Sequence, residues 1–254
     1  MTERLLERQV RLLEFLTSRD AIFGGETGSP VDPALEGFDR GLLRLEARFS
    51  YEKRMDKIAR VFPRTFSLLA SDSAAIVRAF VEAYPPLETS RLDNGSEFYD
   101  FLCERWRSVP PDPPYLRDVA ACELACLRSR VGGVEQRREP PQCGKPQTRE
   151  ALPSSVRRCR GFTLLRCAYD IRSIFEGDGA VAANGIAPAK RELSLVIGVL
   201  PGDDQPQVFE IPDVAFDLLA ELDEWTDAAA FATSPDVNQL IAELLEHGLV
   251  EIRR

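Results

Sequence analysis

The sequence predicts an α+β protein, with a helical bundle in its N-terminal half and a small sheet with helices in its C-terminal half. Three observations support this class. Apolar residues recur at helical spacing through residues 1–130. A segment rich in Gly, Pro, Gln and Arg follows at 131–150. Beyond it, alternating apolar residues precede helical stretches, a pattern typical of a peptide-recognition element or a winged helix.

The N-terminal domain, residues 1–130, is predicted to be a bundle of about six helices, because its apolar residues share faces and capping residues stand at its breaks. Pro63 marks a break or the first residue of a new helix. Ser96 is expected to cap a helix that follows a turn at 92–95. The expected helices span 3–19, 33–50, 51–69 with the break at Pro63, 71–84, 97–107 and 115–130.

Residues 131–150 are expected to form a linker or a long surface loop between the two domains. From Arg128 to Arg160 nine basic residues face three acidic ones, although the whole chain has a net charge of −9. Two interpretations stay open: a solvated basic linker, or a docking patch for an acidic peptide or partner surface. The residues assigned to docking are Arg137, Arg138, Arg157, Arg158 and Arg160.

The C-terminal domain, residues 151–254, is organised around a predicted hairpin over 191–211. Leu193, Leu195, Ile197 and Val199 alternate as in a strand, and a Pro-Gly-Asp-Asp turn separates them from a second run, 207–211. The other expected elements are strands at 154–160 and 162–167, a helix or strand at 169–175, a loop at 175–188, helices at 213–223 and 234–246, a segment opening at 226, and a strand at 249–252.

A hairpin that leads into a helical cluster leaves an open strand edge, and open edges pair with extended peptides. We therefore expect a peptide to add beside the first strand of the hairpin and to rest on the helix 234–246. The residues assigned to peptide binding are Leu193, Leu195, Ile197, Val199, Val237, Leu240, Ile241 and Leu244.

No catalytic or metal-binding motif competes with this feature. The only histidine, His247, precedes Gly248 at a predicted helix end, which excludes a Ser-His-Asp triad elsewhere in this chain. Cys122 and Cys126 lie one helical turn apart and could share a soft metal or serve a standalone enzyme, but buried helix-face cysteines are commoner. Trp225 stands in a carboxylate cluster, for which a solvated helix end and a cation or basic-peptide contact stay open. We expect no catalytic residue, metal or cofactor here.

Composition and sequence pattern indicate the compartment of the protein and the partners it lacks. Six cysteines without a Cys-x-x-Cys pair, and an N-terminus without an export signal, predict reduced thiols and a cytoplasmic protein. No apolar run approaches the length of a membrane span. A DNA-binding transcriptional regulator is the alternative reading of the last helices, but their recognition helix carries Asp236, Glu243 and Glu246 and no basic residue. We expect no nucleic-acid and no membrane partner.

The order of several motifs resembles a known family. In the N-terminal half these are Arg60-Val61-Phe62-Pro63-Arg64-Thr65-Phe66-Ser67-Leu68-Leu69, Gly95-Ser96-Glu97-Phe98-Tyr99-Asp100-Phe101-Leu102 and Leu116-Arg117-Asp118-Val119-Ala120-Ala121-Cys122-Glu123. Leu152-Pro153-Ser154-Ser155-Val156-Arg157 follows the linker, and the segments 216–223 and 237–250 are similar to a PqqD-like leader-recognition module. Together they resemble the HvfC/MbnC/TglI-like partner subunits of TIM-barrel multinuclear iron enzymes in peptide natural-product (RiPP) pathways. In that family a large residue follows the Glu of the third motif, where this chain has Leu124 and Ala125.

The resemblance implies that iron and the oxidative chemistry belong to a partner enzyme. This chain would bind the precursor peptide, present its cysteine for modification, and form a heterodimer with that enzyme. A pathway of the 3-thiaglutamate type is the branch that a complete C-terminal module favours.

Overall fold

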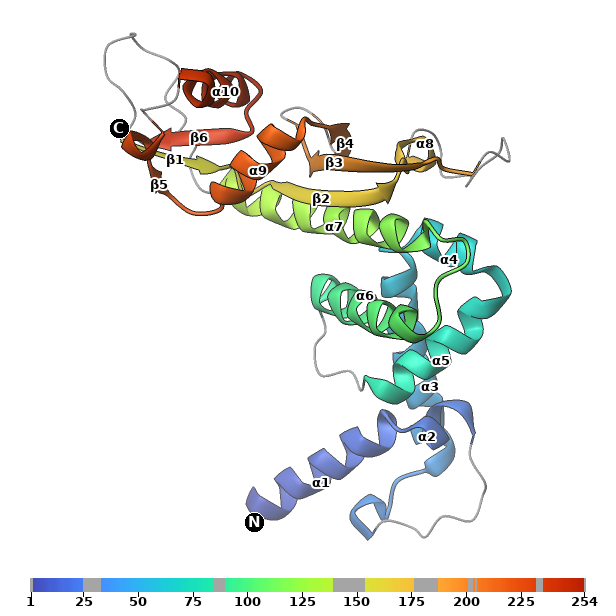
Figure 1. Cartoon of the computed structure of the whole chain (residues 1–254). Coiled ribbons are helices and arrows are strands. Elements are labelled where there is room, and N and C mark those ends of the chain that lie inside the picture. The colour runs from blue at the N-terminus through green and yellow to red at the C-terminus, as the bar shows by residue number, and fades with distance from the viewer. Residues whose placement is uncertain are drawn as a thin grey trace. The chain divides into compact units, whose positions relative to one another are not determined.

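The computed structural model describes residues 2–24, 33–84, 90–138, 154–175, 187–200, 203, 205–231 and 235–253. The chain divides into two compact units, Met1–Asp112 and Pro113–Arg254, and each is described by itself (Figure 1). Their helices and two small antiparallel sheets confirm the α+β class. Within the described ranges, no helix is both long enough and apolar enough to cross a bilayer.

The first unit is helical, as expected. Pro63 is the first residue of α4, where its fixed φ and missing N–H suit the first turn. Ser96 does not cap a helix, because α6 begins five residues earlier: the Asp93 N–H donates to Ser90 Oγ at 3.0 Å, and the expected turn at 92–95 is helical. The helices are α1 (Thr2–Leu16), α2 (Arg19–Phe23), α3 (Arg40–Ala59), α4 (Pro63–Leu69), α5 (Ser73–Ala83) and α6 (Arg91–Ser108), with 3-10 turns at Pro33–Leu35 and Ala70–Asp72.

Aromatic rings form the core of this unit around one buried arginine. The ring of Phe98 lies 5.5 Å from that of Phe62 and 5.2 Å from that of Phe80, centroid to centroid. The guanidinium of Arg54 lies 4.6 Å from the centroid of the Phe80 ring, and the whole residue is only 7% exposed. Burying a cation requires partners for its donors, and these are described below with the cavity of this unit.

The second unit begins with α7 (Leu116–Arg138), and here two predicted boundaries are wrong. We expected the helix 115–130 to close the N-terminal domain, but α7 packs on the sheet formed by β2 and β3. We expected residues 131–150 to be a linker, but α7 continues to Arg138, while 139–150 lie outside the described residues. The helix is tied to the sheet by Ser129, whose hydroxyl donates to the Ile197 carbonyl at 2.8 Å, and by Asp118, which accepts from two amides of β2.

Two three-stranded antiparallel sheets complete this unit. In one sheet the order is β2-β3-β4, and in the other it is β5-β1-β6. One apolar cluster joins both sheets with α9 and α10; Val196, Leu219 and Val250 are among its most buried members. The strands are β1 (Ser155–Arg158), β2 (Phe162–Tyr169), β3 (Lys190–Gly198), β4 (Gln207–Glu210), β5 (Thr226–Asp227) and β6 (Val250–Arg253); the helices are α8 (Arg172–Phe175), α9 (Asp213–Glu221) and α10 (Pro235–Glu246), with a 3-10 turn at Ala228–Ala230.

Backbone geometry explains two glycines of this unit. A Cβ on Gly198 would lie 2.0 Å from Phe162 Cδ1, and one on Gly132 would lie 2.6 Å from the Arg160 carbonyl oxygen. Both contacts are closer than atoms tolerate, so each glycine allows two elements to touch. At the end of α10, Gly248 has φ +69°, which fits the expected helix end after His247.

Candidate peptide-binding edge

The expected hairpin exists, but its first strand is not an edge. β3 pairs with β4 on one side, as predicted, and with β2 on the other. A peptide therefore has no free backbone to pair with beside Leu193, Leu195 or Ile197, and this part of the prediction is wrong. These three side chains are at most 5% exposed, and Val199 lies just past the end of the strand. Leu193, Leu195 and Ile197 are part of the core instead of a binding surface.

Within the described ranges, the outer side of β4 is an open edge. The Ile211 N–H donates to the Ser194 carbonyl at 2.9 Å, so position 211 faces β3. Since facing alternates along an antiparallel strand, Phe209 and Gln207 also face β3, whereas Val208 and Glu210 turn their N–H and C=O groups away from it. Among the described residues no partner is found for these outward backbone groups. The edge thus offers two donors and two acceptors in the spacing of a strand.

The opposite edge of the same sheet, on β2, is more enclosed. At one end the Phe162 N–H donates to the Cys159 carbonyl, and at the other the Ala168 N–H donates to Asp118 at 2.8 Å. Both α7 and α9 make their main sheet contacts with β2 and β3 (Figure 1). From β2, Arg166 pairs with Asp217 of α9. Burial raises the pKa of the Asp118 carboxyl, and its two backbone hydrogen bonds oppose that rise. Between these two ends Leu164 and Arg166 also face away from β3. The β2 edge is thus closed at its ends, and within the described ranges no such contact closes the ends of β4.

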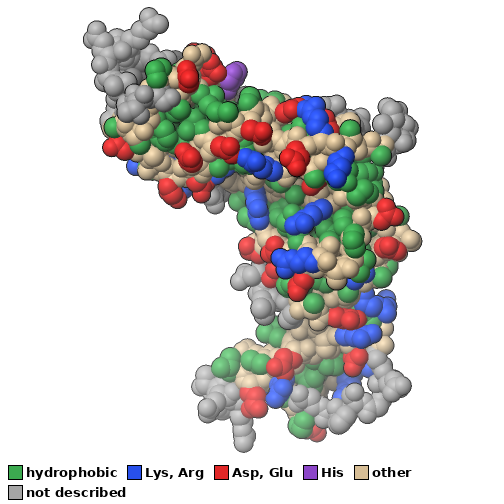
Figure 2. Space-filling view, in the orientation of Figure 1, with side chains coloured by type: hydrophobic (Ala, Val, Ile, Leu, Met, Phe, Trp, Pro, Cys, Tyr) green, Lys and Arg blue, Asp and Glu red, His purple; other side chains and the backbone are tan. Residues whose placement is uncertain are grey.

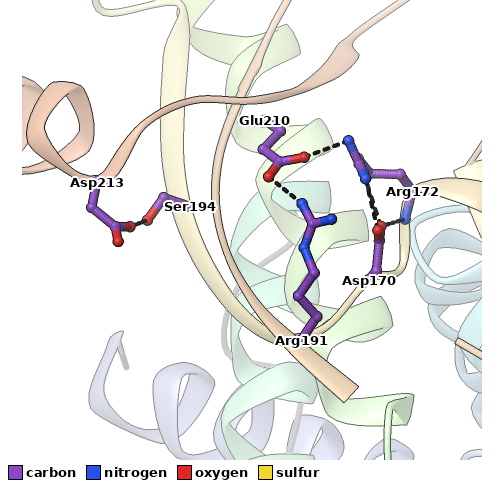
Figure 3. A network of polar contacts seen from close by, with 6 residues as sticks. All are labelled: Asp170, Arg172, Arg191, Ser194, Glu210 and Asp213. Carbon is purple, nitrogen blue, oxygen red and sulfur yellow. Dashed lines mark hydrogen bonds and ion pairs between the residues drawn. The ribbon is translucent and has the colours of Figure 1, made fainter. Parts of the chain in front are cut away.

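A polar network fixes the end of β4 (Figure 3). Glu210 accepts from Arg191 of β3 and pairs with Arg172 at 2.6 Å, and Arg172 in turn binds Asp170 at 2.7 Å. Hydrogen bonds from Arg172 hold the pKa of Asp170 below its usual value. Two guanidinium groups and two carboxylates balance in charge, and their contacts tie the end of β4 to β3 and α8.

The chain leaves the sheet beside this network. Ser194, which is 4% exposed, donates to Asp213 at 2.6 Å from the middle strand. Asp213 is the first residue of α9, and Pro212 occupies the cap position. The bond sets the angle at which the chain turns from β4 into α9.

Of the peptide-binding residues predicted on α10, some are partly exposed and one is buried. Leu244 is 5% exposed and belongs to the core, whereas Val237, Leu240 and Ile241 are half-buried at its border. Phe209 of β4 lies on the same border. In Figure 2 hydrophobic side chains gather beside the purple histidine that follows α10, with Asp and Glu side chains around them.

Two of the predicted docking arginines, Arg157 and Arg158, are engaged in ion pairs. Arg157 donates to Glu251 at 2.9 Å, with side chains 9% and 14% exposed, and its guanidinium lies 4.5 Å from the Trp225 ring centroid. Arg158 pairs with Asp223. These two contacts join β1 to its neighbours, so they contradict the docking role for Arg157 and Arg158. Arg160 is exposed, and α7 contains Arg137 and Arg138, whose side chains lie outside the described residues.

Of the two helix-face cysteines, Cys122 is buried and Cys126 is half-buried. Cys122 is buried, and its pKa is raised well above the ordinary value by a hydrogen bond with Cys126 and by burial. Burial also raises the pKa of Cys167, which lies on β2, to about 12. Protonated, enclosed thiols are poor nucleophiles and ligands. In the part of the chain that the structure describes, no three His, Cys, Asp or Glu side chains are placed to hold a metal ion.

Sequence reasoning missed Asp118 and the outward edge of β4. Asp118 was visible only as an acidic residue in the first turn of a helix, where such residues are common. Which residues of β4 face outward could not be known before the register of β4 with β3 was known. Comparison with known proteins adds no assignment: no protein-family model matches this chain, and no curated protein matches it.

Proposed function

We propose that this protein is a non-catalytic partner subunit that binds an extended precursor peptide along the outer edge of β4. The observation that supports it is the pair of outward-facing residues, Val208 and Glu210, whose backbone groups are unused among the described residues. Strand addition uses such groups for affinity and the alternating side chains for selection. Phe209, half-buried on β4 itself, supplies an apolar contact for one face of the guest.

The family resemblance in the sequence supports the rest of the proposal. By that resemblance the peptide is the precursor of a RiPP, such as one in a 3-thiaglutamate-type pathway, and a TIM-barrel multinuclear iron enzyme modifies its cysteine. The iron and the oxidation are assigned to that enzyme, and this chain is assigned to hold and present the peptide. A DNA-binding regulator fits less well, because the exposed side of α10 carries Asp236, Glu243 and Glu246.

The test is a titration of the labelled precursor peptide encoded beside this chain's gene, with two variants at one position. Val208→Pro removes the outward N–H but no bond to β3, and prolines are tolerated at strand edges. We expect a loss of about three- to tenfold in affinity, the range for one hydrogen bond. Val208→Thr keeps the N–H and the branched shape, so its affinity should stay within about twofold.

Equal affinities of the two folded variants would refute addition at this edge. Failure of the chain to co-purify with the neighbouring TIM-barrel protein would refute the partner assignment. A gel shift with random duplex DNA at low salt would reveal the alternative function.

A further inference from the structure

A cavity of about 320 Å³ opens in the first unit, whereas the proposed peptide edge belongs to the second. Its wall is apolar where α1, α2 and α5 meet α3: Leu16, Ile22 and Val81 are representative lining residues. Ile22 and Val81 are buried, and Leu16 is half-buried. The volume lies at the lower end of the range for small-molecule sites, so it suits a small ligand rather than a peptide.

The charges around this cavity are of one sign. Lys53, Arg54 and Lys57 line it, and among the described residues no Asp or Glu side chain does. This stands out in a protein with a net charge of −9. Lys53 and Lys57 are one helical turn apart on α3 and are exposed, so they lie on the solvent side of the cavity.

Arg54 is a fixed part of this wall. Its Nε donates to Asn94 Oδ1 at 2.9 Å, its Nη1 to the Tyr84 carbonyl at 2.6 Å, and its Nη2 to Glu97 at 3.0 Å. Burial lowers the pKa of Arg54, and Glu97 opposes that shift. Because Glu97 balances its charge, Arg54 contributes a rigid wall, and a ligand's anion would meet Lys53 at the rim, where little water must be removed.

We infer that this cavity binds a linear alkyl carboxylate, with the chain between α1, α2 and α5 and the carboxylate at Lys53 and Lys57. The apolar wall selects the chain, and the ammonium groups of Lys53 and Lys57 select an anion over a cation or an alcohol of equal length. This assignment does not depend on the proposed peptide binding.

The first experiment titrates the full chain with hexanoate, octanoate and decanoate below their micelle concentrations. Affinity should rise about fourfold per added methylene until the cavity is full. Decanoate should bind at least fivefold more tightly than decyltrimethylammonium or decanol. Equal affinity for the cation, or no dependence on chain length, would overturn the assignment.

Two matched pairs of variants locate the site. Lys53→Gln with Lys57→Gln should weaken decanoate about fivefold, whereas Arg44→Gln with Arg48→Gln, which removes equal charge from the same helix outside the cavity, should leave it within twofold. Leu16→Asp should weaken binding more than tenfold, whereas Leu42→Asp, at a position 65% exposed and outside the lining, should not. Circular dichroism and Trp106 fluorescence check folding. Equal effects within either pair of folded variants would refute this location.

Discussion

Replacing Arg54 by Met tests how far one buried cation organises the helical unit. Met retains much of the apolar stem but leaves the Asn94 side-chain oxygen, the Tyr84 carbonyl and the Glu97 carboxylate without their donor. Breaking a buried ion pair costs about 3–5 kcal/mol when the remaining charge is enclosed. The Glu97 side chain is 28% exposed, so water recovers part of that cost. We expect a loss of about 3 kcal/mol in the free energy of unfolding.

The assay uses the two tryptophans of the chain. Trp106 belongs to α6 of the first unit and Trp225 to the second, so Trp225→Phe makes Trp106 the only tryptophan reporter. In that background, Arg54→Met should lower the unfolding midpoint of the first unit by roughly 10–20 °C. The matched control is Arg60→Met, because Arg60 forms an ion pair with Asp56 at 2.7 Å but is 65% exposed.

The control should lose less than about 1 kcal/mol, as exposed ion pairs do. If Arg54→Met also loses less than about 1 kcal/mol with an unchanged denaturant slope, the wall of the cavity is not held by this network and the reasoning fails.

Three further outcomes follow. Gly132→Ala should destabilise the second unit by about 1–3 kcal/mol, because its Cβ would meet the Arg160 carbonyl oxygen, whereas Gly133→Ala, with nothing within 4 Å, should stabilise the helix by about 0.5–1 kcal/mol; denaturant midpoints decide. At pH 8 iodoacetamide should modify half-buried Cys103 before Cys167, whose thiol has a pKa of about 12, and mass spectrometry of folded protein would show the reverse order if Cys167 were reactive. Asp170 has a lowered pKa, so it stabilises the fold at pH values above its unfolded pKa near 3.8, and that stability is lost as pH falls through the folded pKa. Arg172→Gln should therefore flatten the loss of unfolding free energy between about pH 5 and pH 2. Identical curves of unfolding free energy against pH for the variant and the unaltered protein would refute the pairing.

Local signals in the sequence predicted elements better than they predicted neighbours. Pro63 at the start of α4 and Gly248 after α10 obey rules that involve only a few adjacent residues. The hairpin of β3 and β4 was also predicted correctly, since its turn and its two runs are contiguous.

The open edge was wrongly predicted beside β3, because only the alternating apolar residues on one face of that strand were considered. Ser194, Val196 and Gly198 are buried as well, between α7 and α9. The apolar Val196 and the small Gly198 were signs of a strand enclosed on both faces, as in the middle of a sheet. A helix such as 116–130, which contains small and apolar residues on several sides, carries no information about which neighbour it covers.

The length of α7 determines how this chain can be cut. Because the helix supplies one face of the β2-β3-β4 sheet, a fragment that starts at residue 139 would leave Leu195 and Ile197 without their covering layer, and it should aggregate. A fragment that starts at Pro113 keeps the layer intact. Anyone who transplants the C-terminal part onto another protein must therefore carry the helix with it, and the graft point belongs in the proline-rich stretch 110–114.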